Sequence, residues 1–301
     1  MLVLFLMMSV GYLANKCKVM NQQSEQLFSR LLVNIACPAL IINSVTTSDR
    51  LESTGALFVI FGAAALYYIV VPFIGKGFIR LLRVPRGQAA KYESMLIYSN
   101  IGFMGLPVAS SVLGPDSVLY LSIFMAVFNI SVFSYGTILM QKSTGTAGKV
   151  NFKKMVNPGT LSAVLAILLY LLEVRLPGLI LQPVASIGNI TTPLAMLVIG
   201  SSLARQPMKE VLREKSLYPF TVVRLLVLPA LTLAVCRWLV ADPMLMGVLV
   251  LVSAMPVASN VVMICSEMGK DVSYIAKGVF FSTVFSVITL PLVSVLIEMA
   301  G

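Results

Sequence analysis

The chain alternates between long apolar runs and short polar stretches. Ten apolar runs are present, with ends defined to within a few residues: 1–15, 27–46, 55–79, 92–113, 117–140, 158–173, 181–203, 218–240, 243–266 and 272–299. A helix needs about 20 residues to cross about 30 Å of hydrocarbon, and most of the runs reach that length. The pattern predicts an all-α integral membrane protein with ten transmembrane helices.

Composition agrees with this prediction. Of the 301 residues, 58% are hydrophobic and 11% are charged, whereas a soluble domain has about 45–50% apolar and about 25% charged residues. The formal net charge of +10 would suggest a nucleic-acid partner in a soluble protein. Here the basic residues lie in the short gaps between apolar runs, so we expect a lipid bilayer and no nucleic acid as the partner.

The distribution of Lys and Arg predicts the orientation of the helices. We number each loop by the apolar run that it follows. The loops after runs 1, 3, 5, 7 and 9, with their flanks, hold 18 of the 22 basic residues. Because basic loops stay in the cytoplasm, we expect a multi-pass protein of the cytoplasmic membrane with both termini outside. The Gly-, Thr- and Lys-rich stretch 141–157 is then a cytoplasmic linker between two halves, 1–140 and 158–301.

The N-terminal run is apolar, has no basic segment before it and no small-residue cleavage site after it, so we expect no cleavable signal peptide. It is also short, because it begins at Met1. Either the native start lies upstream or the first helix crosses incompletely, and we favour an upstream start.

The chain has little catalytic chemistry. It contains no histidine, which removes Ser–His and Cys–His catalysis and His-bound metals, and its four cysteines form no C-x-x-C pair. We interpret Cys17, Cys37, Cys236 and Cys265 as reduced structural residues. We expect no enzyme activity, no metal and no cofactor.

The two halves resemble each other. Five short matches occur in the same order in both: 34–38 with 189–193, Pro72 with Pro229, 107–110 with 256–259, Gly-x-Asp at 114–116 with 269–271, and Val-Phe at 127–128 with 284–285. Because each half has five runs, an odd number, the second half must enter the membrane from the opposite side. This predicts two inverted five-helix repeats, an architecture of secondary transporters.

The fourth and ninth runs each carry an interior proline, Pro107 and Pro256, among small and polar residues. Proline removes an N–H from a helix and is favoured at a first helical position. We therefore expect both helices to break at the proline, with the second half-helix directing its positive N-terminal end to the midplane. No acidic residue is expected deep in any run, so the site is neutral and polar and suits an anion. For each proline alone, a simple kink is the alternative.

The predicted substrate site follows from these breaks. Its residues are Asn100, Gly105, Pro107, Ser110, Ser111, Asn129, Pro256, Ser259 and Asn260. Asn129 either bonds to a neighbouring helix or contacts the substrate. Arg224 is expected to extend to the membrane interface; the alternative is a counter-charge to a substrate carboxylate.

Four stretches resemble the auxin efflux carrier family of membrane transporters, in particular its bacterial branch with a short central loop. They are 11–13, the run SNIGFMGLPV at 99–108, the stretch from NPG at 157–159 through PLAMLVIGSSLA at 193–204, and MPVASN at 255–260. The resemblance implies ten helices in two inverted repeats, with helices 4 and 9 crossing at Pro107 and Pro256. It also implies a fold similar to that of bile-acid/sodium symporters and sodium/proton antiporters. Helices 1, 2, 6 and 7 would form a scaffold and the rest a mobile transport domain, usually in a homodimer.

The implied activity is the movement of small organic anions by elevator-like alternation, and bacterial relatives of this kind are often called malate or malonate permeases. We therefore expect a secondary carrier of mono- or dicarboxylates. The alternative is a cation or cation/proton antiporter of the same fold. Coupling to protons or sodium, or uniport, stays open, as do the direction of transport and the exact substrate.

Overall fold

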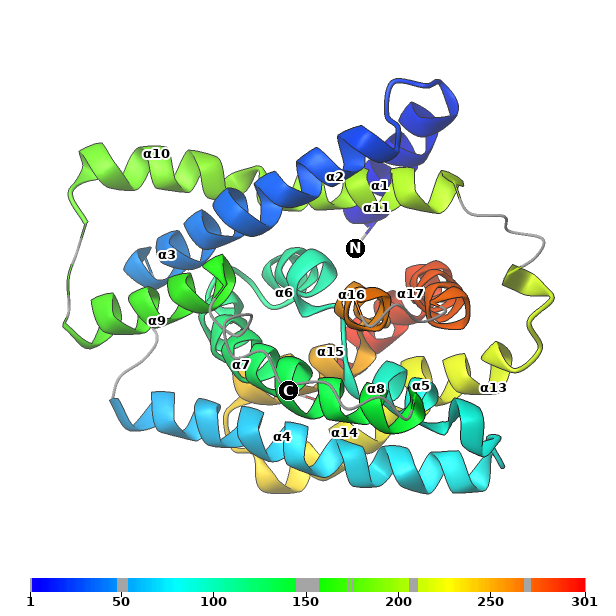
Figure 1. Ribbon diagram of the computed structural model, residues 1–301. Coiled ribbons are helices and arrows are strands. Elements are labelled where there is room, and N and C mark those ends of the chain that lie inside the picture. The colour runs from blue at the N-terminus through cyan, green and yellow to red at the C-terminus, as the bar shows by residue number, and fades with distance from the viewer. Residues whose placement is uncertain are drawn as a thin grey trace. The chain divides into compact units, whose positions relative to one another are not determined.

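The computed structural model describes residues 2–47, 54–144, 157–205 except 173 and 175, 211–267 and 272–300. Over these ranges the chain is helical and forms no strand; one isolated bridge joins Ser99 to Val257. The predicted all-α class is confirmed (Figure 1). Most of the predicted linker 141–157 lies outside the described residues.

The helices have the following bounds, with η marking π-helical turns: α1 Leu2–Lys16, α2 Gln22–Leu31, η1 Leu32–Ala36, α3 Cys37–Thr47, α4 Thr54–Leu81, α5 Arg86–Ile97, η2 Ile101–Gly105, α6 Leu106–Val112, α7 Ser117–Ser131, η3 Val132–Gly136, α8 Thr137–Thr144, α9 Pro158–Leu171, α10 Gly178–Asn189, α11 Thr191–Arg205, α13 Leu217–Val222, η5 Val223–Val227, α14 Leu228–Leu239, α15 Pro243–Ala254, α16 Ser259–Glu267 and α17 Ser273–Ala300.

Six continuous helical stretches are long and apolar enough to cross a membrane: Gln22–Ser44, Gly55–Leu81, Ser117–Gln141, Gly178–Arg205, Leu217–Leu239 and Ser273–Ala300. Four apolar helices are shorter: Leu2–Lys16, Ile101–Val112, Pro158–Leu171 and Pro243–Ala254. Each of the ten predicted runs overlaps one of these stretches. Six membrane-spanning helices are therefore supported by length, and ten crossings remain a prediction.

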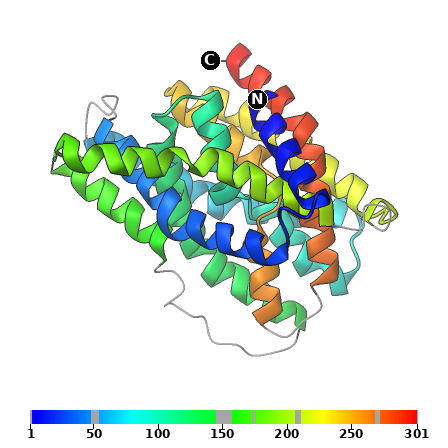
Figure 2. The same cartoon turned by 90° about the horizontal axis from the view of Figure 1, so that it is seen from above.

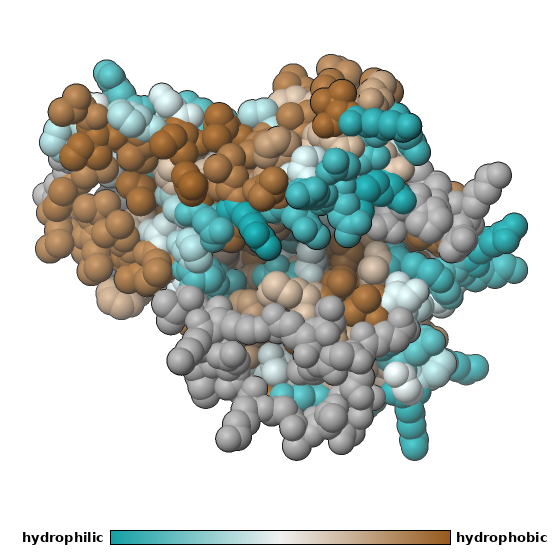
Figure 3. All heavy atoms as spheres, turned by 45° about the horizontal axis from the view of Figure 1, so that its top comes forward, coloured by the Kyte–Doolittle hydropathy of each residue, from teal (hydrophilic) through white to brown (hydrophobic). Residues whose placement is uncertain are grey.

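The outer faces of many helices are apolar. Phe58 and Phe73 of α4 are 74% and 68% exposed, and Leu179 of α10 is 87% exposed. Figure 3 shows such side chains gathered over large parts of one face. Soluble monomers rarely expose apolar patches of this extent, whereas hydrocarbon is their natural environment. The exposed surface is that of a protein embedded in a bilayer.

The contacts divide the chain into two compact units, and each draws on both halves of the sequence. Unit 1 comprises Met1–Ile60, Ile101–Ala126 and Asn157–Pro207. Unit 2 comprises Phe61–Asn100, Val127–Val156 and Met208–Gly301. Helices α1 to α3 and α9 to α11 therefore fall in unit 1, and α13 to α17 fall in unit 2.

Unit 1 is built on the close approach of α1 and α11, which lie side by side in Figures 1 and 2. A Cβ atom added to Gly11 would collide with the backbone of Leu197, and one added to Gly200 would collide with the carbonyl oxygen of Met8. Small residues let the backbones of membrane helices approach closely. These two glycines therefore set the distance between α1 and α11.

A buried ionic cluster adds to this contact. Glu25 of α2 is only 4% exposed, and its carboxylate accepts hydrogen bonds from Arg205, from Ser201 at 2.5 Å and from Asn15 at 3.3 Å. Glu25 also forms an ion pair with Arg205. The cluster connects α1, α2 and α11. Sequence periodicity did not reveal it, because Glu25 lies just outside the predicted apolar run.

The α1–α11 contact generates the first prediction. Gly200→Ala should lower the free energy of unfolding by about 1–3 kcal/mol, because the added methyl overpacks the helix interface. Gly62→Ala in α4 is the matched control, since no atom lies within 4 Å of its added Cβ, and alanine favours a helix over glycine by about 1 kcal/mol. Thermal unfolding in detergent measures the stability of both variants against the wild type. Equal stability of the two variants would contradict the role of Gly200.

Candidate functional site

The fourth and ninth predicted runs are both interrupted. The chain leaves helical geometry after Ile97 and re-enters it at Ile101, and it does so again between Ala254 and Ser259. Pro256 lies inside the second interruption, as predicted. The first interruption is not at Pro107, so that prediction is wrong.

Pro107 lies in the first turn of α6, directly after the π-turn η2. The π-turn changes the hydrogen-bond register just ahead of the ring, so the missing N–H of Pro107 falls at the junction of η2 and α6. The helix therefore continues through Pro107. The chain breaks instead at Tyr98–Asn100, where no proline is present.

The two interruptions are joined by backbone hydrogen bonds. The Asn100 N–H donates to the Pro256 carbonyl at 2.8 Å, and the Ala258 N–H donates to the Tyr98 carbonyl at 2.9 Å. Ser99 and Val257 form the antiparallel bridge between these bonds. The Val257 N–H donates to the hydroxyl of Ser282 in α17 at 3.0 Å. Away from water such groups need internal partners, and the bridge supplies them.

Arg224 of η5 completes this arrangement. Its Nη1 donates to the Ser253 carbonyl at 2.5 Å and its Nη2 donates to the Ser99 hydroxyl at 2.6 Å. The Ser99 hydroxyl in turn donates to the Val252 carbonyl at 2.6 Å. Both carbonyls belong to the last turn of α15, which carries the negative end of the helix dipole. The guanidinium therefore caps a helix that ends inside the protein.

Arg224 is 0% exposed, so the expectation that it extends to the interface is wrong. Its Nε has no hydrogen-bond partner, and no carboxylate is paired with it in the part of the chain that the structure describes. Burying a charge in this way is costly. The oxygen atoms at the two helix breaks offset part of that cost, which explains why the side chain turns inward.

The other predicted site residues divide between the units. Asn100, Asn129 and Pro256 are buried in unit 2, where Asn260 is half-buried and Ser259 is exposed. Gly105, Pro107, Ser110 and Ser111 belong to unit 1, with Ser111 exposed and Ser110 half-buried. The structure thus brings Asn100 and Pro256 together through their backbones. The substrate contacts of all nine residues remain predictions.

Gly105 has a packing role in unit 1. A Cβ atom there would lie 3.3 Å from side-chain atoms of both Ile101 and Leu121, which is a tight contact. The residue therefore allows η2 to pack against α7.

A buried carboxylate was missed by sequence reasoning. Glu93 of α5 is 6% exposed and accepts a hydrogen bond from the Tyr135 hydroxyl at 2.6 Å. It is the second residue of the predicted run 92–113, so its sequence position alone does not place it deep in a run. The expectation that the runs contain no buried acidic residue is wrong. No local pattern marks Glu93, because its burial depends on α4 and η3.

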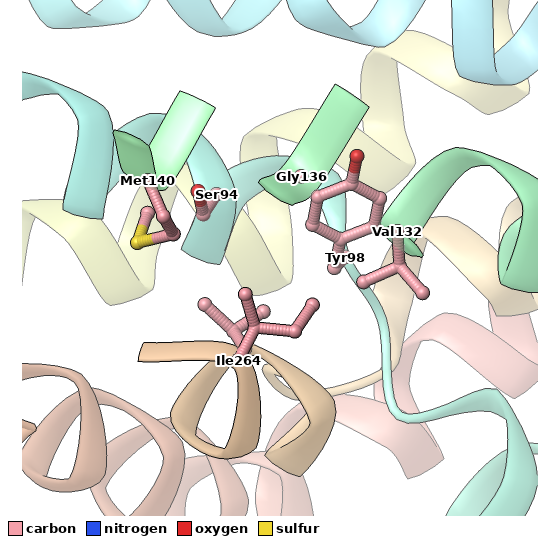
Figure 4. Close-up of a pocket in the computed structure, with 7 residues that line it drawn as sticks. Ser94, Tyr98, Val132, Gly136, Met140 and Ile264 are labelled. Carbon is pink, nitrogen blue, oxygen red and sulfur yellow. The ribbon is translucent and has the colours of Figure 1, made fainter. Parts of the chain in front are cut away.

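A narrow pocket lies beside the first interruption, in unit 2. Its lining residues, drawn in Figure 4, come from α5, η3, α8 and α16 and from Tyr98. They are Ser94, Tyr98, Val132, Gly136, Met140, Val261 and Ile264. It leaves essentially no space for even a water molecule, whereas ordinary ligand sites have volumes of roughly 300–1,000 Å³. We therefore regard it as a packing crevice in this conformation.

Among the described residues, no group of three or more His, Cys, Asp or Glu side chains is placed so that it could hold a metal ion. None of the four cysteines, all of which the structure describes, forms a disulfide; Cys17 is exposed and the other three are buried. The absence of a metal or cofactor remains a prediction.

These features define a class of protein. Apolar helices of membrane-spanning length, an apolar exposed surface and two internally satisfied helix breaks are the traits of a multi-pass membrane protein of the transporter type. The comparison with known families identifies which one: the chain belongs to the family described as "Membrane transport protein", which it matches over residues 1–294. The resemblance to auxin efflux carriers is thereby confirmed.

Similar proteins are found in archaea and bacteria. An "Uncharacterized transporter" of Methanothermobacter thermautotrophicus is 22% identical over 290 residues, covering 96% of this chain and 94% of its own. A "Putative malonate transporter" of Rhizobium meliloti is 23% identical, covering 93% and 89%. "Uncharacterized transporter YfdV" of Escherichia coli is 24% identical, covering 97% and 95%. The chain therefore spans almost the full length of these relatives.

The hydrogen bonds of Ser99 generate the second prediction. Ser99→Ala removes the acceptor of Arg224 Nη2 and the donor to Val252, and should lower the free energy of unfolding by about 1–3 kcal/mol because buried polar groups lose their partners. Ser286→Ala is the control, because Ser286 is equally buried and bonds only to Thr283 of its own helix. Denaturation in detergent gives the free energy of unfolding of both variants. A larger loss of stability for Ser286→Ala than for Ser99→Ala would refute the role of Ser99 in joining Arg224 to α15.

Proposed function

We propose that the chain is a secondary carrier of small organic anions, such as mono- and dicarboxylates, with the substrate at the break of the fourth and ninth predicted helices. The observation that carries the proposal is the pair of interrupted helices joined by the bridge from Ser99 to Val257, in a chain that belongs to a membrane transport family. Discontinuous helices form the substrate sites of many secondary transporters.

Corresponding helix bounds support an inverted repeat. Helices α5 and α15 each have 12 residues and each ends at an interruption. The stretch α7–η3–α8 runs from Ser117 to Thr144, and α17 runs from Ser273 to Ala300. Helices α1 and α9, the first of each predicted repeat, are also similar in length, with 15 and 14 residues. Ten helices in two repeats of five would place both interruptions at the same depth, as carriers of this type require.

The chemistry of the break supports an anionic substrate. Helix α16 begins at Ser259, directly after the interruption, and its first residues Ser259 and Asn260 are partly or fully exposed. Helix N-termini carry a partial positive charge and free N–H groups. In the same unit the break contains the full positive charge of Arg224. A relative named "Putative malonate transporter" fits this chemistry.

The two units support elevator-like movement. Unit 1 contains α1, α2, α3, α9, α10 and α11, which correspond to the predicted helices 1, 2, 6 and 7 of the scaffold. Unit 2 holds most of the remaining helices, including the bridge and Arg224. We propose that unit 2 is the larger part of the transport domain and moves with the substrate.

A cation/proton antiporter is the second candidate, and Glu93 is the observation that favours it. This buried carboxylate lies five positions before Tyr98, where the helix breaks, and buried acidic residues serve as proton relays in membrane proteins. Its hydrogen bond to Tyr135 gives it a structural role as well. A pH-jump flux without any organic anion would favour this candidate.

The carrier proposal predicts uptake of radiolabelled malonate, or of another mono- or dicarboxylate, by proteoliposomes containing the purified protein. Asn260→Ala should lower the initial rate about tenfold or more, because losing one hydrogen bond to a charged ligand costs about 1.5–3 kcal/mol. Ser186→Ala is the control, since Ser186 is exposed on α10 and bonds only within its helix. If no carboxylate enters or leaves the vesicles, the substrate proposal fails.

A further inference from the structure

Arg224 is an unusual side chain for the inside of a membrane protein. It is completely enclosed, it is not paired with a carboxylate in the described part of the chain, and one of its N–H groups is unpartnered. Replacing buried charged groups by apolar ones is often neutral or stabilising. Stability alone therefore gives no reason for a cation at this position, which suggests a functional one.

The partners of Arg224 indicate what that function is. Nη1 contacts the carbonyl of Ser253 at the C-terminal end of α15, and Nη2 contacts the hydroxyl of Ser99 in the other interruption. Carbonyls of unwound backbone and the C-terminal ends of half-helices are the groups with which transporters hold a coupling sodium ion. Carbonyl and hydroxyl oxygens are ligands of hard cations in general.

We propose that Arg224 is a built-in cation that occupies the position of a coupling ion at the helix break, so that transport needs no sodium. A guanidinium already hydrogen-bonded to these oxygens uses their lone pairs. Its positive charge also repels a second cation at short range, and the low-dielectric surroundings screen this repulsion weakly. The consequence for transport rests on the proposed carrier function, but the cation site itself does not.

Arg224 acts in this proposal as a positioning residue. It holds the end of α15 against Ser99, and a bound sodium ion would hold the same oxygens in a sodium-coupled carrier. The guanidinium stays attached to η5, so the break keeps its positive charge whether or not an ion gradient is present.

The test uses the purified full-length protein and needs no organic substrate. Thermal unfolding is measured in NaCl, KCl and choline chloride at equal ionic strength, and with added ethylguanidinium, for the wild type, Arg224→Ala, Arg224→Lys and Arg237→Ala. Arg237 lies on α14 of the same predicted run and is exposed, so its removal controls for loss of charge. A cation that binds only the native state raises the unfolding temperature.

We expect equal unfolding temperatures in the three salts for the wild type, Arg224→Lys and Arg237→Ala. Arg224→Ala should unfold at a lower temperature and regain about 3 °C or more in ethylguanidinium or sodium, because the vacated oxygens then accept an external cation. A sodium-specific rise in the wild type would overturn the proposal. So would an Arg224→Ala protein that responds to neither cation.

If Arg224→Ala does not fold, the wild-type measurement and Arg224→Lys still decide. A lysine at this position still supplies a positive charge. A sodium-specific rise in the unfolding temperature of Arg224→Lys therefore counts against the proposal, and the absence of such a rise supports it. Sodium-dependent malonate flux by the wild type would also overturn it. Absence of all carboxylate flux, with the expected cation responses, would reject the proposed substrate and leave the role of Arg224 in place.

Discussion

The polar backbone at two interrupted helices is the constraint on which unit 2 depends. Each interruption releases N–H and C=O groups that hydrocarbon cannot satisfy. The bridge between Ser99 and Val257 pairs some of them, Ser282 accepts from another, and Arg224 donates to the end of α15. Four separate parts of the chain therefore have to meet at one place. The packing of α13 to α17 is organised around that meeting point.

The two units solve the problem of helix association differently. In unit 1, α1 and α11 approach so closely that Gly11 and Gly200 leave no space for a side chain, and a buried ion pair from Glu25 to Arg205 holds α2 to the same helices. In unit 2, polar side chains bond to broken helices. Close glycine contacts and a balanced ion pair fit the proposed static scaffold. A break whose cation has no carboxylate partner in the described part of the chain fits the proposed site for an anion.

The position of Arg224 reconciles the predicted neutral site with the proposed anionic substrate. The residues predicted to contact substrate carry no formal charge, yet Arg224 lies behind the break with its charge facing inward. Its field and the N-terminal dipole of α16 both favour negative charge nearby. The carboxylate of Glu93 instead accepts a hydrogen bond from the Tyr135 hydroxyl.

The sequence by itself determined the all-α membrane class, the approximate extent of the ten apolar runs and the break at Pro256. These features depend on local composition, because hydrocarbon selects apolar residues over the whole length of a helix and proline acts on its own turn. Family motifs in the fourth and seventh runs also lie within single stretches, so the sequence alone indicates the transporter family.

Only the tertiary structure decided where the first helix breaks, which way Arg224 turns and that Glu25 and Glu93 are buried. Ser99 and Arg224 are 125 positions apart, and no periodicity within either run indicates that they meet. Whether a polar group is buried and satisfied depends on atoms supplied by distant segments. The chain breaks at Tyr98–Asn100 because Pro256 and Ala258 offer backbone partners there, and that choice exists only in the folded protein.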